Sequence, residues 1–189
     1  MGVEQLQAIF AKKGYVWDSR LNIVGVRNGS TKKITNLFDD NIFVAYKACG
    51  VWLVKGYSAT TDPGRYYTKV KLLSPKGAAI LKEGQYRGVY AIRKHQNKYE
   101  ALCQTWGNVV VYRDGNKNDV YDFSATEAGQ FGINLHKAGA ASLKVENWSA
   151  GCQVFARSAD FEDFMAKIRP HKAELGNKYT YTLINSIDL

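Results

Sequence analysis

Two residues with reactive side chains lie in segments that suit catalysis. His136 ends the apolar stretch FGINLH, and Cys152 lies in SAGCQVF, directly after residues with small side chains. A cysteine nucleophile needs a base that takes its proton and N–H groups that stabilise an oxyanion. An imidazole beside a thiol is expected to lower the thiol pKa. The spacing alone allows either such a pair or a strand-end histidine and a buried cysteine that lie far apart.

The residues before Cys152 predict a tight loop. Ser149, Ala150 and Gly151 let consecutive backbone N–H groups converge on one point, and the glycine leaves room for a substrate. The other two cysteines, Cys49 and Cys103, lie in apolar, strand-like segments and are expected to be buried small hydrophobes. An odd number of cysteines without a close pair argues against a disulfide framework.

Charge and hydropathy limit the partners and the location. The net charge of +9 favours a polyanionic partner, either nucleic acid or an anionic cell envelope. The basic residues are scattered and no nucleic-acid motif occurs, so a nucleic-acid-binding β domain is the weaker alternative and no nucleic-acid partner is expected. No apolar run reaches the length of a membrane helix, and the N-terminus lacks a signal-peptide pattern. We therefore expect no transmembrane segment and synthesis in the cytoplasm.

The distribution of β-branched and aromatic residues predicts a mainly β, β-rich α+β fold. A short N-terminal helix over 3–13 should end at Gly14, and a helix over 158–175 should follow the cysteine, with Ser158 as its cap and a kink or end at Pro170. Between and after them we expect one compact, mostly antiparallel sandwich or barrel domain, with residues 1–40 as an extension of the catalytic part 41–189. The predicted strands are 21–28, 41–47, 51–61, 65–73, 88–95, 99–105, 108–115 and 178–187.

Metal sites are not expected. The stretch RDGNKNDVYD (113–122) has the Asp and Asn rhythm of a calcium loop, but its glycine and its twelfth residue, Ala125, do not match one. A hairpin with an Asp-Gly turn is the favoured interpretation. The histidines His95 and His171 lie in polar, basic stretches, which predicts that both are solvated. No set of residues has zinc spacing.

The segments GINLHKAG and SAGCQVF together resemble the active-site signature of the L,D-transpeptidase (YkuD-like) catalytic domain family. In that family a histidine at a strand end precedes a Ser/Thr-His-Gly-Cys motif. Upstream, YSATTDPGRYY (57–67) is similar to the family's Thr-Pro-x-Gly-aromatic segment, which lines the substrate groove. As an order of elements the likeness covers residues 42–189, and it also resembles small phage-encoded proteins that act on peptidoglycan. Papain-like and NlpC/P60-like peptidases place the cysteine first and fit less well.

The resemblance implies roles for these residues. Cys152 would be the nucleophile, His136 the general base and then the general acid, and Ser149 would shape the loop, while the backbone N–H groups of Gly151 and Cys152 would bind the oxyanion. A main-chain carbonyl near the histidine often orients it in the family. Asn134, on the same strand face as His136, is a further candidate for that role. The residues implied for the substrate groove are Asn134, Trp148, Thr61, Asp62, Gly64 and Tyr66.

Two positions depart from the family's pattern. Ala150 stands where the motif usually has histidine, and Val154 stands where the family often has arginine or asparagine. The segment 137–148 between the histidine and the motif is also slightly short. These differences concern how the carboxylate of the substrate is held, and a basic residue from elsewhere, Arg87 or Arg65, is a candidate substitute.

The function expected from the resemblance is cysteine-dependent hydrolysis of peptidoglycan stem peptides through a thioester acyl-enzyme, without a cofactor. Such a protein would be an endolysin-like peptidase, monomeric, acting in the periplasm or cell wall after release by a partner such as a holin. The alternatives are an L,D-transpeptidase or L,D-carboxypeptidase of wall remodelling, and a catalytically inactive envelope-binding or phage structural protein.

Overall fold

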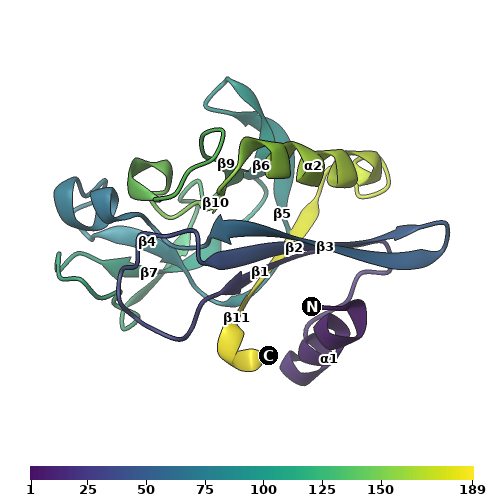
Figure 1. The fold of residues 1–189 in the computed structure, drawn as a ribbon, viewed down its shortest axis with the longest axis horizontal. Coiled ribbons are helices and arrows are strands. Elements are labelled where there is room, and N and C mark those ends of the chain that lie inside the picture. The colour runs from purple at the N-terminus through teal and green to yellow at the C-terminus, as the bar shows by residue number, and fades with distance from the viewer.

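A closed barrel of eight strands forms the centre of the computed structural model, which describes residues 1–189 (Figure 1). Around the barrel the order is β1-β11-β5-β6-β9-β10-β3-β2, with parallel pairing only between β1 and β11 and between β9 and β10. The β-rich class expected from the sequence is confirmed. The barrel strands are β1 Leu21–Arg27, β2 Asp40–Ala48, β3 Val51–Thr60, β5 Gly84–His95, β6 Tyr99–Gln104, β9 Leu135–Lys137, β10 Gln153–Phe155 and β11 Tyr179–Asn185.

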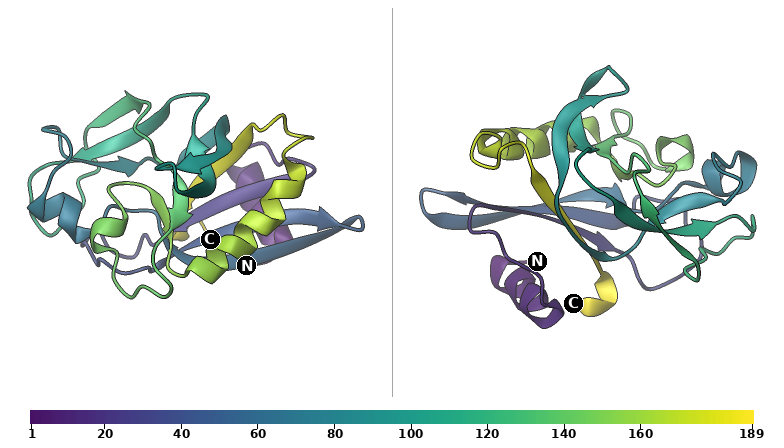
Figure 2. Two further views of the ribbon diagram at one scale, coloured as in Figure 1. Left: turned by 90° about the horizontal axis from the view of Figure 1, so that it is seen from above. Right: turned by 180° about the vertical axis from the view of Figure 1, so that it is seen from behind.

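A second, antiparallel sheet of three strands lies beside the barrel (Figure 2). It consists of β4 Ala78–Leu81, β7 Val109–Asp114 and β8 Thr126–Gly129, in the order β4-β7-β8. Neither β4 nor β8 is predicted from the sequence, because strands of four residues carry too little alternation to be recognised. The small sheet matters for the site because its first strand forms one wall beside Cys152.

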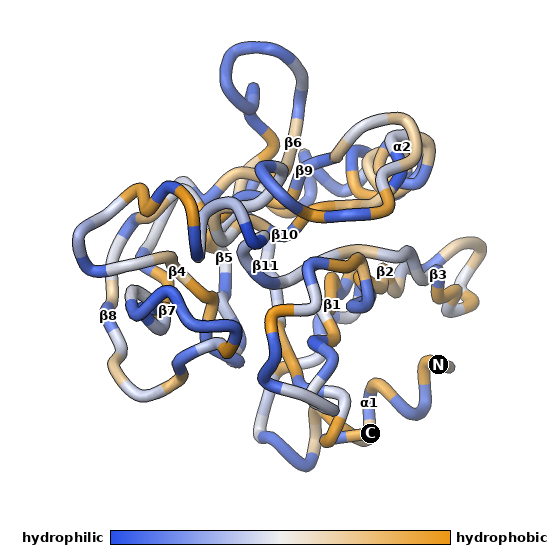
Figure 3. The backbone as a smooth tube through the Cα atoms, turned by 60° about the vertical axis from the view of Figure 1, so that its left-hand side comes forward, coloured by the Kyte–Doolittle hydropathy of each residue, from blue (hydrophilic) through white to orange (hydrophobic).

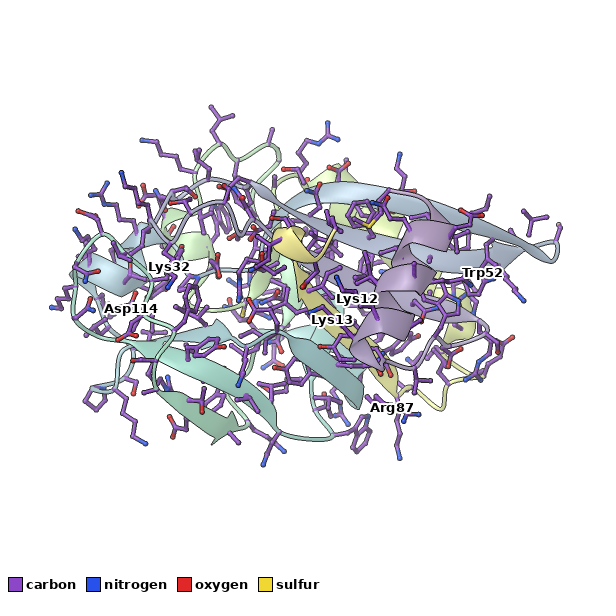
Figure 4. The ribbon with its side chains drawn as sticks, turned by 90° about the horizontal axis from the view of Figure 1, so that it is seen from below. Lys12, Lys13, Lys32, Trp52, Arg87 and Asp114 are labelled. Carbon is purple, nitrogen blue, oxygen red and sulfur yellow. The ribbon has the colours of Figure 1, made fainter.

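The first helix, α1 Val3–Lys13, packs on the outside of the barrel. Its buried residues Leu6, Ile9 and Phe10 contact strands β1, β2 and β11, and it ends at Gly14 as predicted. Figure 4 shows α1, with Lys12 and Lys13 at its end, crossing this face near Trp52 of β3. Since β1 faces the barrel interior on one side and α1 on the other, all seven of its residues are buried. Residues 1–40 thus contribute both a barrel strand and the helix that covers it.

The second helix, α2 Ser158–Ile168, covers the barrel interior on the opposite side of the β1–β2–β3 strands (Figure 1). Its apolar face belongs to the same core cluster as the interior tyrosines of β5 and β11. Figure 3 shows apolar segments at β1 and β4. Of the two predicted effects of Pro170, the structure shows an end and not a kink: the helix stops at Ile168, short of residue 175, and Pro170 lies in the following 3-10 turn, Arg169–His171. The predicted cap is wrong by one position: Arg157 is the N-cap residue and makes no side-chain cap hydrogen bond.

The segment 65–73, predicted as a strand, forms a π-helical turn, Tyr66–Val70. No strand lies beside it to pair with. Its backbone bonds locally instead: the N–H groups of Tyr67 and Thr68 donate to the Gly64 carbonyl. The aromatic and β-branched residues there favour a strand, but a strand needs a neighbouring strand, and none pairs with this segment.

The loop between β7 and β8 replaces the tight Asp-Gly hairpin turn predicted at 113–122. The two strands do form an antiparallel hairpin, but Tyr112 pairs with Thr126, so the connection is long. Asp114 (Figure 4), at the end of β7, is 1% exposed and neither of its carboxylate oxygens has a hydrogen-bond partner. Burial, and secondarily the charge of Asp122, raises the pKa of Asp114 to about 6.

Replacing Asp114 with asparagine should therefore stabilise the protein at pH 7.5, by about 1–2 kcal/mol, because it removes a buried charge that lacks a partner. A carboxyl group whose pKa is higher in the folded than in the unfolded state destabilises the fold when it ionises, so the wild type gains stability as the pH falls through 6 toward 4. The advantage of Asp114→Asn should accordingly disappear near pH 4. Urea unfolding of both proteins at the two pH values measures this. Asp119→Asn, in the same loop but exposed, is the matched control; equal stability of Asp114→Asn and wild type at pH 7.5 would contradict the prediction.

None of the helices combines the length and the apolar character that crossing a lipid bilayer requires.

Candidate functional site

Parallel pairing of β9 with β10 brings Cys152 and His136 to one place. His136 is the register partner of Val154, and Cys152 lies two residues before Val154. Side chains two positions apart on a strand share a face, so the thiol and the imidazole lie diagonally across the pair of strands. Both residues line one cavity of about 510 Å³, although no hydrogen bond joins them directly.

His136 is oriented by the main chain. It is 6% exposed, and its Nδ1 lies 3.0 Å from the Lys137 carbonyl oxygen. A carbonyl only accepts, so Nδ1 carries the proton of the neutral ring and Nε2 is the basic atom. Burial lowers the pKa of His136 to about 4, against the opposing effect of the Lys137 carbonyl. The imidazole is therefore an uncharged base at neutral pH.

The thiol of Cys152 is half-buried beneath the loop that precedes β9. Its Sγ lies 3.5 Å from the Asn134 N–H and 3.4 Å from the Gly132 carbonyl. Burial raises the pKa of Cys152 to about 11, and the Asn134 N–H only partly offsets this. The expectation of a thiol pKa lowered by the imidazole is thus wrong, because the nearby imidazole is uncharged and cannot stabilise a thiolate. Both groups are neutral at rest.

The loop before the cysteine is closed by Ser149. Its hydroxyl donates to the Cys152 carbonyl at 2.7 Å and accepts from the Gly151 N–H at 3.1 Å. The Gly151 N–H is therefore occupied, which corrects the prediction that it binds an oxyanion. The Cys152 N–H has no acceptor in the protein and remains available for that role.

Gly151 is required by its surroundings. Its φ of +133° lies in the region that side chains disfavour, and a Cβ there would lie 2.2 Å from the Ala79 carbonyl oxygen of β4. This close approach places the loop before Cys152, residues 149–151, against β4 of the small sheet.

A second cavity, of about 480 Å³, opens on the other side of Cys152 between the barrel and the small sheet. It contains Arg113 of β7 and Phe131, and the first cavity contains Lys98, Lys137, Tyr99 and Trp148. The residues shared by the two cavities are Tyr67, Leu73, His95, Gln96, Ala150 and Cys152. The thiol therefore lies at the junction of two cavities, each with at least one basic side chain.

The predicted groove residues divide into two sets. Asn134 and Trp148 line the cavities at Cys152, as does Ala150, which was predicted to belong to the loop before the cysteine. Those that line neither cavity are Thr61, Asp62, Gly64, Tyr66 and Arg87, together with the substitute Arg65, which pairs with Asp119. Arg87 lies on β5 at the edge of the molecule shown in Figure 4.

The segment 57–67 supports the cysteine loop instead of lining a groove. The Thr61 carbonyl accepts from the side-chain amide of Gln153 at 3.3 Å, and the Gly64 N–H donates to the Ser149 carbonyl at 2.8 Å. A Cβ on Gly64 would lie 2.0 Å from the Glu146 carbonyl oxygen, so only glycine allows this contact. Asp62 forms an ion pair with the buried Arg27. The Pro63-Gly64 part of the segment is therefore explained by packing beneath the site.

His95 is the site residue that the sequence analysis missed. It was predicted to be solvated, but it is 9% exposed, and its ring stacks on that of His136 with centroids 4.3 Å apart and planes 15° apart. His95 ends β5, and the pairing of β5 with β6 and of β6 with β9 brings it to His136. The polar sequence around it gave no signal of this contact. His171 is half-buried near Glu174.

The other two cysteines lie away from the site. Cys103 is buried, as predicted, and donates to the Arg93 carbonyl. Cys49 is exposed, which corrects the prediction of burial: with Gly50 it forms the tight turn between β2 and β3, where both residues have positive φ.

No group of three or more His, Cys, Asp or Glu side chains is arranged to hold a metal ion. Comparison of the chain with protein-family models, with curated proteins and with solved structures finds no match.

Proposed function

We propose that the protein is a cysteine-dependent hydrolase of peptidoglycan stem peptides, with an L,D-transpeptidase-like arrangement of its catalytic strands. The observation that carries the proposal is the placement of Cys152 and His136 on one face of two paired strands, lining one cavity, with the basic Nε2 of His136 free of any protein partner. A thiol that attacks a carbonyl group needs a base nearby, and this placement supports that role for His136. The sequence likeness to that family supports the choice of substrate.

The reaction would begin with two neutral groups. Sγ of Cys152 attacks the carbonyl carbon of a stem-peptide bond while its proton passes to Nε2 of His136. The tetrahedral intermediate collapses, the C–N bond breaks, and the leaving amine takes the proton from His136. Water then attacks the thioester, gives a proton to His136, and the thiol is restored with release of a carboxylic acid.

One unpaired basic side chain near the thiol suits an acidic substrate. Lys98 lines one of the two cavities and forms no ion pair, whereas Arg113 pairs with Glu127 and Lys137 pairs with Glu162. Stem peptides carry several carboxylates, and guanidinium and ammonium groups bind these in solvent-accessible grooves. The net charge of +9 would also favour approach to an anionic cell envelope.

Transpeptidation is the second candidate, and the observation that favours it is the presence of a cavity on each side of the thiol. One cavity can hold the acyl donor and the other an amine acceptor in place of water.

The test compares wild type with Cys152→Ala on purified Gram-negative peptidoglycan in H₂¹⁸O, with the soluble muropeptides analysed by mass. Shortened stems that contain ¹⁸O, released by wild type only, support the hydrolase. New cross-links without loss of stems favour the transpeptidase and overturn hydrolysis. If both proteins sediment with peptidoglycan and neither changes it, the protein is an envelope-binding protein and the enzymatic proposal fails.

A further inference from the structure

We infer that His95 is a second active-site histidine, a neutral donor whose Nε2–H stabilises the oxyanion formed when Cys152 attacks. This inference rests on the proposed thioester chemistry, and it assigns to His95 the role that the occupied N–H of Gly151 does not fill. It follows from the hydrogen bonds that fix the ring of His95.

Asn134 determines which nitrogen of His95 carries the proton. The Gln104 N–H donates to Oδ1 of Asn134 at 2.9 Å, so the oxygen of this side chain must face Gln104. Its NH₂ group then faces Nδ1 of His95, 3.2 Å away. An NH₂ group only donates, so Nδ1 of His95 is unprotonated and the proton of the neutral ring lies on Nε2.

The same contact keeps His95 uncharged. In an imidazolium both nitrogens carry protons, and the Nδ1–H would then face the NH₂ of Asn134, donor against donor. Burial, and secondarily the charge of Lys98, also lowers the pKa of His95. Stacking against His136 also keeps His95 uncharged, because a positive charge on either ring disfavours a positive charge on the other.

The two stacked rings are therefore opposite tautomers. His136 donates through Nδ1 to the Lys137 carbonyl and keeps Nε2 as a base, whereas His95 accepts at Nδ1 and keeps Nε2 as a donor. Nε2 of His95 has no protein partner and is not sealed from solvent, and the residue lines both cavities that meet at Cys152. One ring can thus take the thiol proton while the other donates a hydrogen bond to the developing oxyanion, together with the Cys152 N–H.

The experiment uses p-nitrophenyl acetate, which acylates a reactive thiol and releases p-nitrophenolate, and reads the burst of one equivalent per protein. All proteins carry Cys49→Ser, because the exposed Cys49 would otherwise be acylated as well. His95→Phe keeps a stacking ring but has no donor, so its acylation rate should fall by about 10²–10³-fold with little change in KM. His95→Gln, which retains an N–H donor, should recover much of the loss. His171→Phe is the matched control and should acylate like wild type. Thermal unfolding of each variant shows that the fold is kept.

Asn134→Asp separates hydrogen-bond donation by His95 from a purely structural role, because the two roles predict different pH dependences of acylation. A carboxylate facing Nδ1 would draw the proton of the His95 ring to Nδ1, which leaves Nε2 without a proton at neutral pH. Acylation should therefore be slow at pH 8 and should recover as the pH falls and the ring becomes doubly protonated.

Histidine ¹⁵N spectra report the tautomer of His95 directly, and assignment is simple because the chain has three histidines. In wild type at pH 7, His95 should carry its proton on Nε2.

A proton on Nδ1 of His95 in wild type, or unchanged acylation in His95→Phe, would overturn the inference. If wild type is acylated by the ester in a manner that depends on His95 but releases nothing from peptidoglycan, the inference stands and only the proposed substrate fails. If wild type shows no burst between pH 5 and pH 9, the thioester chemistry fails and the role of His95 fails with it.

Discussion

Replacement of His136 by glutamine should slow acylation of Cys152 by about 10²–10⁴-fold, the usual contribution of a general base. The size of the effect follows from the resting state of the site. Because burial holds the pKa of Cys152 at about 11 and that of His136 at about 4, almost no thiolate exists at pH 7. In the proposed reaction the thiolate must therefore be generated during attack, and Nε2 of His136 would accept the proton. Glutamine fills similar space but has no basic nitrogen.

The pH dependence distinguishes this general-base mechanism from a preformed thiolate–imidazolium pair. The base works only when unprotonated, so kcat/KM should rise as the pH increases through 4 and then stay level until the thiol ionises near 11. A preformed pair would give a bell-shaped profile instead, with both limbs closer to neutral pH. Stopped-flow acylation across pH 3.5–10 measures this, and a bell centred on neutral pH would contradict the assignment.

Alkylation of the free protein provides a separate check on the protonation state of Cys152. A neutral, half-buried Cys152 should react with iodoacetamide at pH 7 more slowly than the exposed Cys49. Mass mapping of the labelled peptides compares the two directly, and Cys49→Ser is the control that isolates Cys152. Faster labelling of Cys152 would show that its thiolate is stabilised at rest.

Much of the barrel can be predicted from the sequence, because its long strands carry their own signal. The runs at 41–47 and 51–61 are rich in β-branched and aromatic residues, and the structure has β2 and β3 there. The short β9 and β10 carry no such signal, since strands of three residues exist only through their neighbours. The segment before His136 was expected to be an apolar strand, whereas 153–155 was recognised only as part of a reactive segment, and the pairing of β9 with β10 is what places His136 beside Cys152.

The parts that could not be predicted depend on contacts between distant segments. His95 reaches His136 only because the barrel closes through β6, and nothing local to RKHQNK indicates a buried imidazole. Similarly, Thr61 and Asp62 look like groove residues when only the motif around them is considered. Their partner, Arg27, lies on β1, and the pairing is visible only in three dimensions.

Arg27 is the residue whose loss should destabilise the fold most. Its side chain is 2% exposed and lies among three acidic groups: Nε is 2.9 Å from Asp62, Nη1 is 2.8 Å from Glu83, and Asp40 bonds to the adjacent Thr61. Nη2 donates to the Leu81 carbonyl at 2.8 Å. Burial alone would lower the pKa of Arg27, but the charges of Asp62, Glu83 and Asp40 raise it above its usual value. The guanidinium thus joins β1 to the ends of β3 and β4.

Arg27→Met should therefore cost about 3–5 kcal/mol of unfolding free energy at pH 7.5, because it leaves buried carboxylates without their cation. Burial already raises the pKa of Asp40 and of Asp62, and removal of Arg27 should raise both further. A carboxyl group with a raised folded-state pKa destabilises the fold above that pKa, so the deficit of Arg27→Met should shrink as the pH is lowered toward 5. Urea unfolding of wild type and variant at the two pH values gives both numbers.

The matched control is Arg20→Met, which removes an arginine from an exposed pair with Asp18 and should change stability by less than about 1 kcal/mol. Arg27→Met/Asp62→Asn removes one of the unpaired charges and should recover part of the loss. The defect should also reach the site, because the Thr61 carbonyl that accepts from Arg27 also accepts from Gln153, the residue after Cys152. If Arg27→Met unfolds at the same urea concentration as wild type at pH 7.5, the ion pairs of Arg27 do not stabilise the fold. The loop before Cys152 would then be held by the packing of Gly64 against Glu146 and not by Arg27.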